Sequence, residues 1–165
     1  MKLIITDSSP IISLAVIQRL DILESFCSNY YLPRVVFLEL EYHLPKQVPN
    51  SGWFLHRLKP RVLDIDNPEI FADFAPNLGE GERACFMLAR ETGIENLLID
   101  DREARQFAES QGWNCFGTLG LMVKAKKAGL IQELRPYFAT FAASRRHYTA
   151  DLLNHVLHLA QEQPL

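Results

Sequence analysis

Apolar residues follow two alternating patterns along this chain. Short, mostly apolar runs predict buried strands at Leu3–Thr6, Tyr30–Leu32, Val62–Ile65, Leu97–Asp100 and Asn114–Phe116. Segments in which apolar residues recur every three or four positions predict helices at Pro10–Phe26, Arg34–His43, Gly81–Thr92, Asp101–Gln111 and Leu119–Ala128. Strands that alternate with helices predict an α/β fold, with a mostly parallel five-stranded sheet covered on both faces.

The pattern changes after Gly129, where no further strand is indicated. Two final helices are predicted at Ile131–Ala143 and Ala150–Glu162. The segment Leu44–Trp53 predicts the longest loop, and Asn67–Asn77 predicts an irregular stretch with room for a short helix. We expect residues 1–165 to form a single domain, with a core over residues 1–134 and a C-terminal helical extension over residues 135–165.

Composition and charge exclude several classes of protein. A chain of 165 residues with 48% hydrophobic residues can bury a core, and its net charge of −3 excludes a broadly basic protein. Nucleic-acid binding would need local basic patches or metal ions. Three widely spaced cysteines argue against disulfides or a zinc site, and no apolar run suits a membrane span or a signal peptide. We therefore expect a cytoplasmic protein without a membrane partner.

The first candidate for chemistry is Asp7, which ends the first predicted strand. Ser9 and Pro10 already supply an N-cap and a first helical residue for the next segment, so Asp7 has no evident structural role. It lies beyond the carboxyl end of a buried strand, where open α/β sheets bind ligands. Asp7 is therefore expected to point into a binding crevice.

Three further acids are predicted on the apolar faces of their helices: Glu39, which is expected to lie centrally between Val35, Val36, Tyr42 and His43, and Glu82 and Asp101. Glu80 points nearly opposite to Glu82 and is the better candidate for a solvated acid. The structural alternative is that an acid near a helix start serves as a cap, and Asp100 with Glu103 has the spacing of a capping box.

Carboxylates that converge in a crevice need a compensating charge. Two of them about 4 Å apart repel by roughly 4 kcal/mol at an effective dielectric constant near 20. Few basic residues share these faces, and Arg105 beside Asp101 is the nearest. Oxygen donors without nitrogen or sulfur suit Mg²⁺ or Mn²⁺ rather than zinc.

These residues, in this order, resemble the PIN-domain ribonucleases. The resemblance is carried by the segments Asp7–Ile12, Pro33–Leu40, Leu78–Glu82, Leu97–Arg102 and Phe116–Gly120. The sequences LGEGE and DDR within them are similar to the signatures of one prokaryotic branch of this superfamily. Many members of the superfamily are toxins of toxin–antitoxin pairs.

The resemblance implies a Rossmann-like three-layer α/β/α sandwich whose acids bind one or two Mg²⁺ or Mn²⁺ ions. The implied catalytic acids are Asp7, Glu39, Glu82 and Asp101. The implied metal ligands are Asp7, Glu82 and Asp101, joined by Glu39 or Asp100. The implied substrate-binding residues are Ser8, Thr118 and Arg102. Glutamate at position 82 departs from the aspartate of many PIN enzymes, and the adjacent pair Asp100–Asp101 leaves the identity of the fourth acid open.

The implied function is a metal-dependent endoribonuclease that cleaves single-stranded or looped RNA, with an antitoxin partner if it is a toxin. A basic rim for RNA can come from Arg102, Arg105, Lys124, Lys126, Lys127 and the pair Arg145–Arg146, although the lysines are more typical of a solvated helix face. Trp53 is expected to anchor a loop and Tyr148 to pack in the interior, rather than to stack on bases.

Two alternatives to a nuclease are kept. The first is a PIN-fold module that binds nucleic acid or acts as a scaffold without catalysis. The second is a two-component receiver domain, which expects its acid pair after the first strand, whereas this pair follows the fourth. The apolar stripe of the last helix predicts core packing, with a homodimer or antitoxin-binding surface as the alternative.

Overall fold

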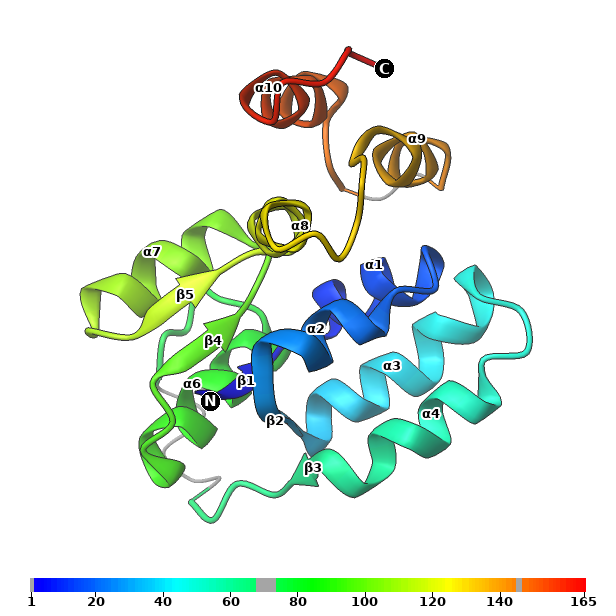
Figure 1. Ribbon diagram of the computed structural model, residues 1–165. Coiled ribbons are helices and arrows are strands. Elements are labelled where there is room, and N and C mark those ends of the chain that lie inside the picture. Colours follow the sequence, from blue (N-terminus) through cyan, green and yellow to red (C-terminus); the bar gives the residue numbers. More distant parts are fainter. Residues whose placement is uncertain (1, 68–73, 145–146) are drawn as a thin grey trace.

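The central element of the fold is a five-stranded parallel sheet. The computed structural model describes residues 2–67, 74–144 and 147–165. The strands are β1 (Lys2–Thr6), β2 (Cys27–Pro33), β3 (Val62–Leu63), β4 (Asn96–Leu98) and β5 (Asn114–Phe116). Their order is β3-β2-β1-β4-β5, so successive strands are added on one side of β1 up to β3 and on its other side from β4 onward (Figure 1). The predicted α/β class and the five-stranded parallel sheet are confirmed.

Helices cover both faces of this sheet and give a three-layer α/β/α arrangement. The helices are α1 (Ser8–Val16), α2 (Leu20–Phe26), α3 (Arg34–Gln47), α4 (Gly52–Leu58), η1 (Lys59–Arg61), α6 (Glu80–Thr92), α7 (Arg102–Ser110), α8 (Thr118–Lys127), α9 (Arg135–Ala143) and α10 (Ala150–Leu159). Helix α6 packs against β1 and β2, while α2 packs against β2 and contacts α8. Helices α9 and α10 lie beyond α8, away from the sheet (Figure 1).

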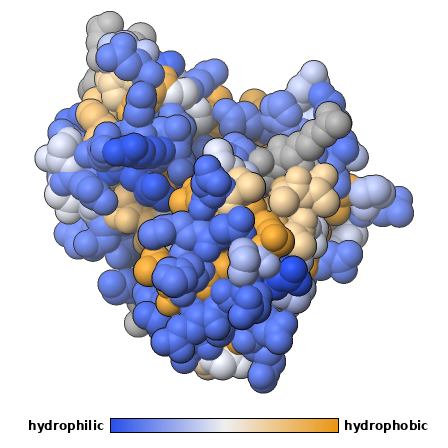
Figure 2. Space-filling model, turned by 90° about the horizontal axis from the view of Figure 1, so that it is seen from above, coloured by the Kyte–Doolittle hydropathy of each residue, from blue (hydrophilic) through white to orange (hydrophobic). Residues whose placement is uncertain are grey.

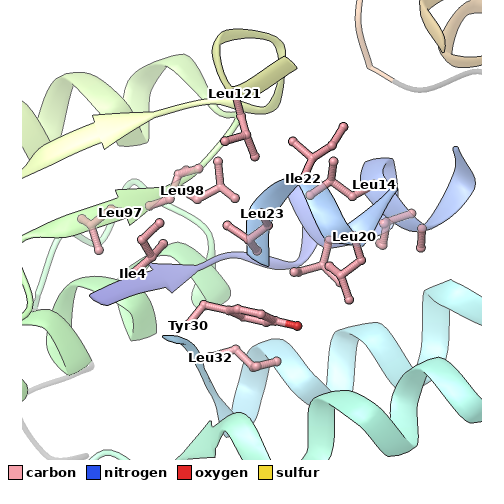
Figure 3. Close-up of a cluster of buried hydrophobic side chains, with 14 of the residues drawn as sticks. Ile4, Leu14, Leu20, Ile22, Leu23, Tyr30, Leu32, Leu97, Leu98 and Leu121 are labelled. Carbon is pink, nitrogen blue, oxygen red and sulfur yellow. The ribbon is translucent and has the colours of Figure 1, made fainter. Parts of the chain in front are cut away.

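The core forms where the sheet meets its covering helices. Ile4 of β1, Leu97 and Leu98 of β4, and Tyr30 and Leu32 of β2 are all at most 2% exposed. Side chains from α1, α2 and α8 gather around them, among them Leu14, Ile22, Leu23 and Leu121 (Figure 3). Because consecutive residues of β1 and β4 are buried, these two strands appear in the sequence as nearly continuous apolar runs.

The first predicted helix is in fact two helices. Residue Gln18 has a φ of 56°, in the left-handed region, and this ends α1 before α2 begins. The backbone N–H of Arg19 donates to the carbonyl of Leu14 at 2.8 Å and closes the turn. Both helices bury apolar residues, so apolar positions continue through the break and the sequence pattern did not reveal it.

The loop predicted at Leu44–Trp53 is also wrong over most of its length. Helix α3 continues through Pro45 to Gln47, and α4 begins at Gly52. Pro45 is exposed, so water can replace the helical hydrogen bond that it lacks, and the next turn closes with the Val48 N–H on the Leu44 carbonyl at 2.8 Å. Trp53 is 63% exposed and does not anchor a loop. Most of the irregular stretch predicted at 67–77 lies outside the described residues.

The C-terminal helices are shorter than predicted. Helix α9 begins at Arg135 rather than Ile131, and α10 ends at Leu159 rather than Glu162. The surface around them is mainly hydrophilic with scattered hydrophobic patches (Figure 2), and Leu152 and Leu159 are exposed by 44% and 68%. None of the helices in the described part of the chain has the length and apolar character needed to cross a membrane.

Candidate active site at the carboxyl edge of the sheet

Asp7 lies where β1 ends, at the point where the strand order reverses. Its backbone N–H donates to the Leu98 carbonyl at 3.1 Å, which fixes it beside β4. Asp7 itself occupies the N-cap position of α1, and its side chain makes no capping hydrogen bond. The prediction that Ser9 would be the cap is therefore wrong, because the helix already begins at Ser8.

The Asp7 side chain is buried with one of its two oxygens unpaired. The residue is 7% exposed, and Oδ1 has no hydrogen-bond partner among the residues that the structure describes. The pKa of Asp7 is raised to about 7, mainly by burial; the negative charges of Glu39 and Glu82 add to the rise, and hydrogen bonds from the backbone N–H groups of Ser8 and Ser9 oppose it. A carboxyl group in this state favours a bound cation or a proton.

Glu39 reaches the same place from α3. The helix buries Val36, Leu40 and Leu44, whereas Tyr42 is 65% exposed, so Glu39 lies at the edge of the buried face. The prediction of a central position on that face is wrong, because the helix is rotated toward Val36 and Leu40. The Glu39 carboxylate is half-buried, and the Ser8 hydroxyl donates to its Oε2 at 2.7 Å.

Gly81 is the residue that lets the two acids meet. A Cβ atom at this position would lie 2.9 Å from Oδ1 of Asp7 and 2.9 Å from Oε1 of Glu39. The sequence reasoning did not single out Gly81 as a site residue, although its place between Glu80 and Glu82 was a usable signal. The two carboxylates converge on one small space above the backbone of α6.

Glu82 follows on the first turn of α6 and has a structural partner as well. Its Oε2 accepts the backbone N–H of Gly79 at 2.8 Å, as in a capping box. Burial raises the pKa of Glu82, the Gly79 N–H lowers it, and the charges of Asp101 and Glu39 raise it again. Glu82 is thus within electrostatic reach of the acids on both sides of it.

The structure gives the two neighbouring acids after β4 different surroundings. The Asp100 side chain is 3% exposed, and its carboxylate accepts the backbone N–H of Thr118 at 2.6 Å and the Thr118 hydroxyl at 2.8 Å. Asp101 is exposed and caps α7, with its Oδ1 accepting the Ala104 N–H at 2.8 Å. The predicted apolar-facing position of Asp101 is therefore wrong, since an N-cap side chain turns back toward the first helical turn. The capping box predicted from Asp100 is likewise absent, because Asp101 takes that role.

A third donor to Asp100 comes from the C-terminal part of the chain. The Tyr148 hydroxyl lies 2.6 Å from Oδ2 of Asp100 and 2.9 Å from the Ser13 hydroxyl. Burial raises the pKa of Tyr148 well above its usual range, with the charge of Asp100 adding to the effect. Tyr148 packs inside, as predicted, but its contact with Asp100 had no signal in the sequence because 47 residues separate the two.

Several of these side chains border one pocket of about 710 Å³, which Glu39 and Thr118 do not line. Its acids are Asp7, Glu82, Asp100 and Asp101. Arg102 and Arg105 line it as well, and Leu119, Leu152 and Val156 give it an apolar wall. Of the other predicted basic residues, Lys126 is engaged with Glu162 at 2.6 Å, and the pair at 145–146 lies outside the described residues.

Comparison with protein families identifies this arrangement. The model of the DUF3368 family, described as a PIN domain, matches residues 3–162. The chain belongs to the PIN-domain family. No curated protein shows significant similarity to it. PIN domains are generally nucleases that act on nucleic acids and usually use divalent metal ions.

The acids of this PIN domain fit a divalent cation in their chemistry. Asp7 has an unpartnered buried oxygen, and Glu39 faces it across Gly81, so a positive charge between them would relieve both desolvation and repulsion. Within residues 2–67, 74–144 and 147–165, three or more ligating side chains are not already gathered at metal-binding geometry. The donor set is therefore suitable, and binding would draw the carboxylates together or use bridging water, as Mg²⁺ commonly does.

Proposed function

We propose that this PIN domain is a Mg²⁺- or Mn²⁺-dependent endoribonuclease. The observation that carries the proposal is the convergence of Asp7 and Glu39 above Gly81, with Glu82 alongside and the Asp7 oxygen buried without a partner. This cluster lies at the reversal point of a parallel sheet, the usual ligand site of open α/β folds.

The acids of the candidate site have separable roles in this proposal. Asp7, Glu82 and one of the neighbours Asp100 and Asp101 would hold the cation. When bound, the cation supplies positive charge for the scissile phosphate and lowers the pKa of a water molecule. Glu39, whose carboxylate is oriented by the Ser8 hydroxyl, would add a ligand or accept a hydrogen bond from the attacking water.

The remaining lining suits a single RNA strand. Arg102 and Arg105 place positive charge in a pocket whose acids would otherwise repel phosphate, and neither forms an ion pair with another residue in the part of the chain described here. The apolar wall at Leu119 offers a surface against which an unpaired base can pack. Single-stranded or looped RNA presents both groups together, so we propose it as the substrate.

A nuclease assay on matched variants tests this function. Wild-type protein should cleave single-stranded RNA with Mn²⁺ and lose that activity in EDTA, while Asp7→Asn and Glu82→Gln should fall to background. Glu80→Gln is the matched control, because Glu80 lies in the same LGEGE segment, is exposed and does not line the pocket. Equal, EDTA-insensitive cleavage by all four proteins would refute the nuclease proposal.

A non-catalytic PIN module is the second candidate. It is favoured by the structural duties of two of the acids: Glu82 holds Gly79, and Asp101 caps α7. If that candidate is right, wild-type protein would bind single-stranded RNA without cutting it in the same assay. The toxin role, its antitoxin and a homodimer also stay predictions, to be tested by the effect of expression on growth, by a neighbouring antitoxin gene and by the mass in solution.

A further inference from the structure

Tyr148 reaches the pocket from the segment between α9 and α10. The residue is 8% exposed, and its ring packs on Phe141 with centroids 5.2 Å apart. Its hydroxyl lies between Asp100, which follows β4, and Ser13 of α1. A residue outside the predicted core thus contacts an acid that lines the candidate site.

The hydrogen-bond directions in this network follow from the chemistry of its members. An ionised carboxylate can only accept, so Tyr148 donates its one proton to Asp100, and Ser13 then donates to the Tyr148 oxygen. Thr118 adds its backbone N–H and its hydroxyl to the same carboxylate. Three donors at 2.6–2.8 Å restrict the orientation of the Asp100 side chain.

This restriction distinguishes Asp100 from its neighbour. The Asp101 carboxylate is exposed and accepts one backbone N–H at the start of α7. An ionised carboxylate offers about four acceptor sites, so three hydrogen bonds leave Asp100 with capacity for one more partner in the pocket that it lines. His147 Nε2 lies 3.7 Å from Oδ2 of Asp100, beyond hydrogen-bond distance and within ion-pair range when the imidazole is protonated. Hydrogen-bonding partners that orient a ligating carboxylate commonly change metal affinity or activity by about 10-fold to 100-fold.

We propose that Tyr148 is a positioning residue of this site: together with Thr118 it holds the Asp100 carboxylate in the orientation used for the cation, so the C-terminal segment completes the pocket. The proposal rests on the proposed nuclease function for its catalytic consequence. It makes Asp100, rather than Asp101, the acid after β4 that binds the cation. It also assigns the segment at 147–148 a role that the fold of the core does not require.

The test compares Tyr148→Phe with Ser13→Ala. Both variants remove a hydrogen bond of the same buried tyrosine hydroxyl, but only Tyr148→Phe removes a donor from Asp100. Three sets of measurements are made: the amide proton shift and hydrogen exchange of Thr118 without metal, the Mn²⁺ affinity by calorimetry, and kcat and KM on single-stranded RNA. Thermal unfolding of both variants shows whether they are folded.

The proposal predicts that Tyr148→Phe moves the Thr118 amide resonance upfield, weakens Mn²⁺ binding about 10-fold and lowers kcat with little change in KM. Ser13→Ala should resemble wild type in all three. If Tyr148→Phe fails to fold, Thr118→Val removes one donor from the same carboxylate and should weaken Mn²⁺ binding in the same way.

The outcomes separate the two proposals. Equal Mn²⁺ affinity and Thr118 amide behaviour in Tyr148→Phe and Ser13→Ala would overturn the positioning role, whatever the activity. Wild-type protein that binds Mn²⁺ without cutting RNA would refute the nuclease function, and the Mn²⁺ affinities of the variants would still decide the role of Tyr148.

Discussion

The substitution Gly81→Ala tests whether the space between Asp7 and Glu39 is the working part of the site. The added Cβ would lie 2.9 Å from Oδ1 of Asp7 and 2.9 and 3.1 Å from the two oxygens of Glu39, whereas ordinary contacts begin at 3.4 Å. Each carboxylate must therefore retreat by about 0.5 Å and lose the space in which a cation would lie. A displacement of about 1 Å at a reacting centre can cost about 100-fold in rate, so we expect roughly a 10-fold loss of kcat or more.

The protein should survive this change. The clashing atoms are ends of side chains that can rotate, so overpacking is expected to cost about 1 kcal/mol, near the low end of its usual range. Alanine in a helix recovers up to about 1 kcal/mol relative to glycine, so the unfolding free energy should change little.

The matched control is Gly120→Ala, on α8. Nothing lies within 4 Å of a Cβ placed there, so this variant should keep full activity and be slightly more stable. Urea unfolding gives the stability of each variant, and an Mn²⁺-dependent RNA cleavage assay gives kcat. Gly81→Ala with wild-type kcat would refute the reasoning, because it would show that the space above Gly81 is not used.

Three further predictions follow from the charges. In EDTA, the unfolding free energy of Asp7→Asn should match that of wild type near pH 4 and exceed it by up to about 4 kcal/mol near pH 7, because the raised pKa makes the folded wild type hold a proton that its unfolded chain loses. A difference in unfolding free energy, measured in urea, that stays the same from pH 4 to pH 7 would contradict this prediction. Asp100→Asn should weaken Mn²⁺ binding about 10-fold, while Asp101→Ala should mainly lower stability by about 1 kcal/mol because it removes the α7 cap, and the reverse order would reassign the ligand. Burial raises the pKa of Glu162, but hydrogen bonds from Lys126 and two backbone N–H groups outweigh it and lower the pKa below 4.5. Glu162→Gln should therefore lower the unfolding free energy by about 2 kcal/mol at neutral pH, and this loss should shrink as the pH falls below 4.5. A loss that does not depend on pH would exclude the charge of Glu162 as its source.

The sequence predicted those parts of the fold that depend on local pattern. Buried strands give apolar runs, and the strand–helix alternation led to the parallel sheet that the structure shows. The break at Gln18 and the helix through Pro45 were not predictable in this way. One depends on a single left-handed residue within continuous apolar spacing, and the other on exposure of a proline to water.

The candidate site was predictable in its residue types and less so in its contacts. Asp7 was singled out because it lacks an evident structural role, and one of its buried oxygens indeed has no hydrogen-bond partner within the described residues. The orientation of Glu39 was misjudged because helical angles do not say which side of a helix faces the core. The contact of Tyr148 with Asp100 arises from how α9 and α10 pack, and local spacing carries no information on it.

The most direct test of the central claim is the position of Mn²⁺ in crystals soaked with the ion, located by anomalous scattering. The account predicts a peak within bonding distance of an Asp7 oxygen and of at least one oxygen of Glu82, Asp100 or Asp101. A peak elsewhere, or none near Asp7 at saturating Mn²⁺, would contradict the claim that these acids form a metal site.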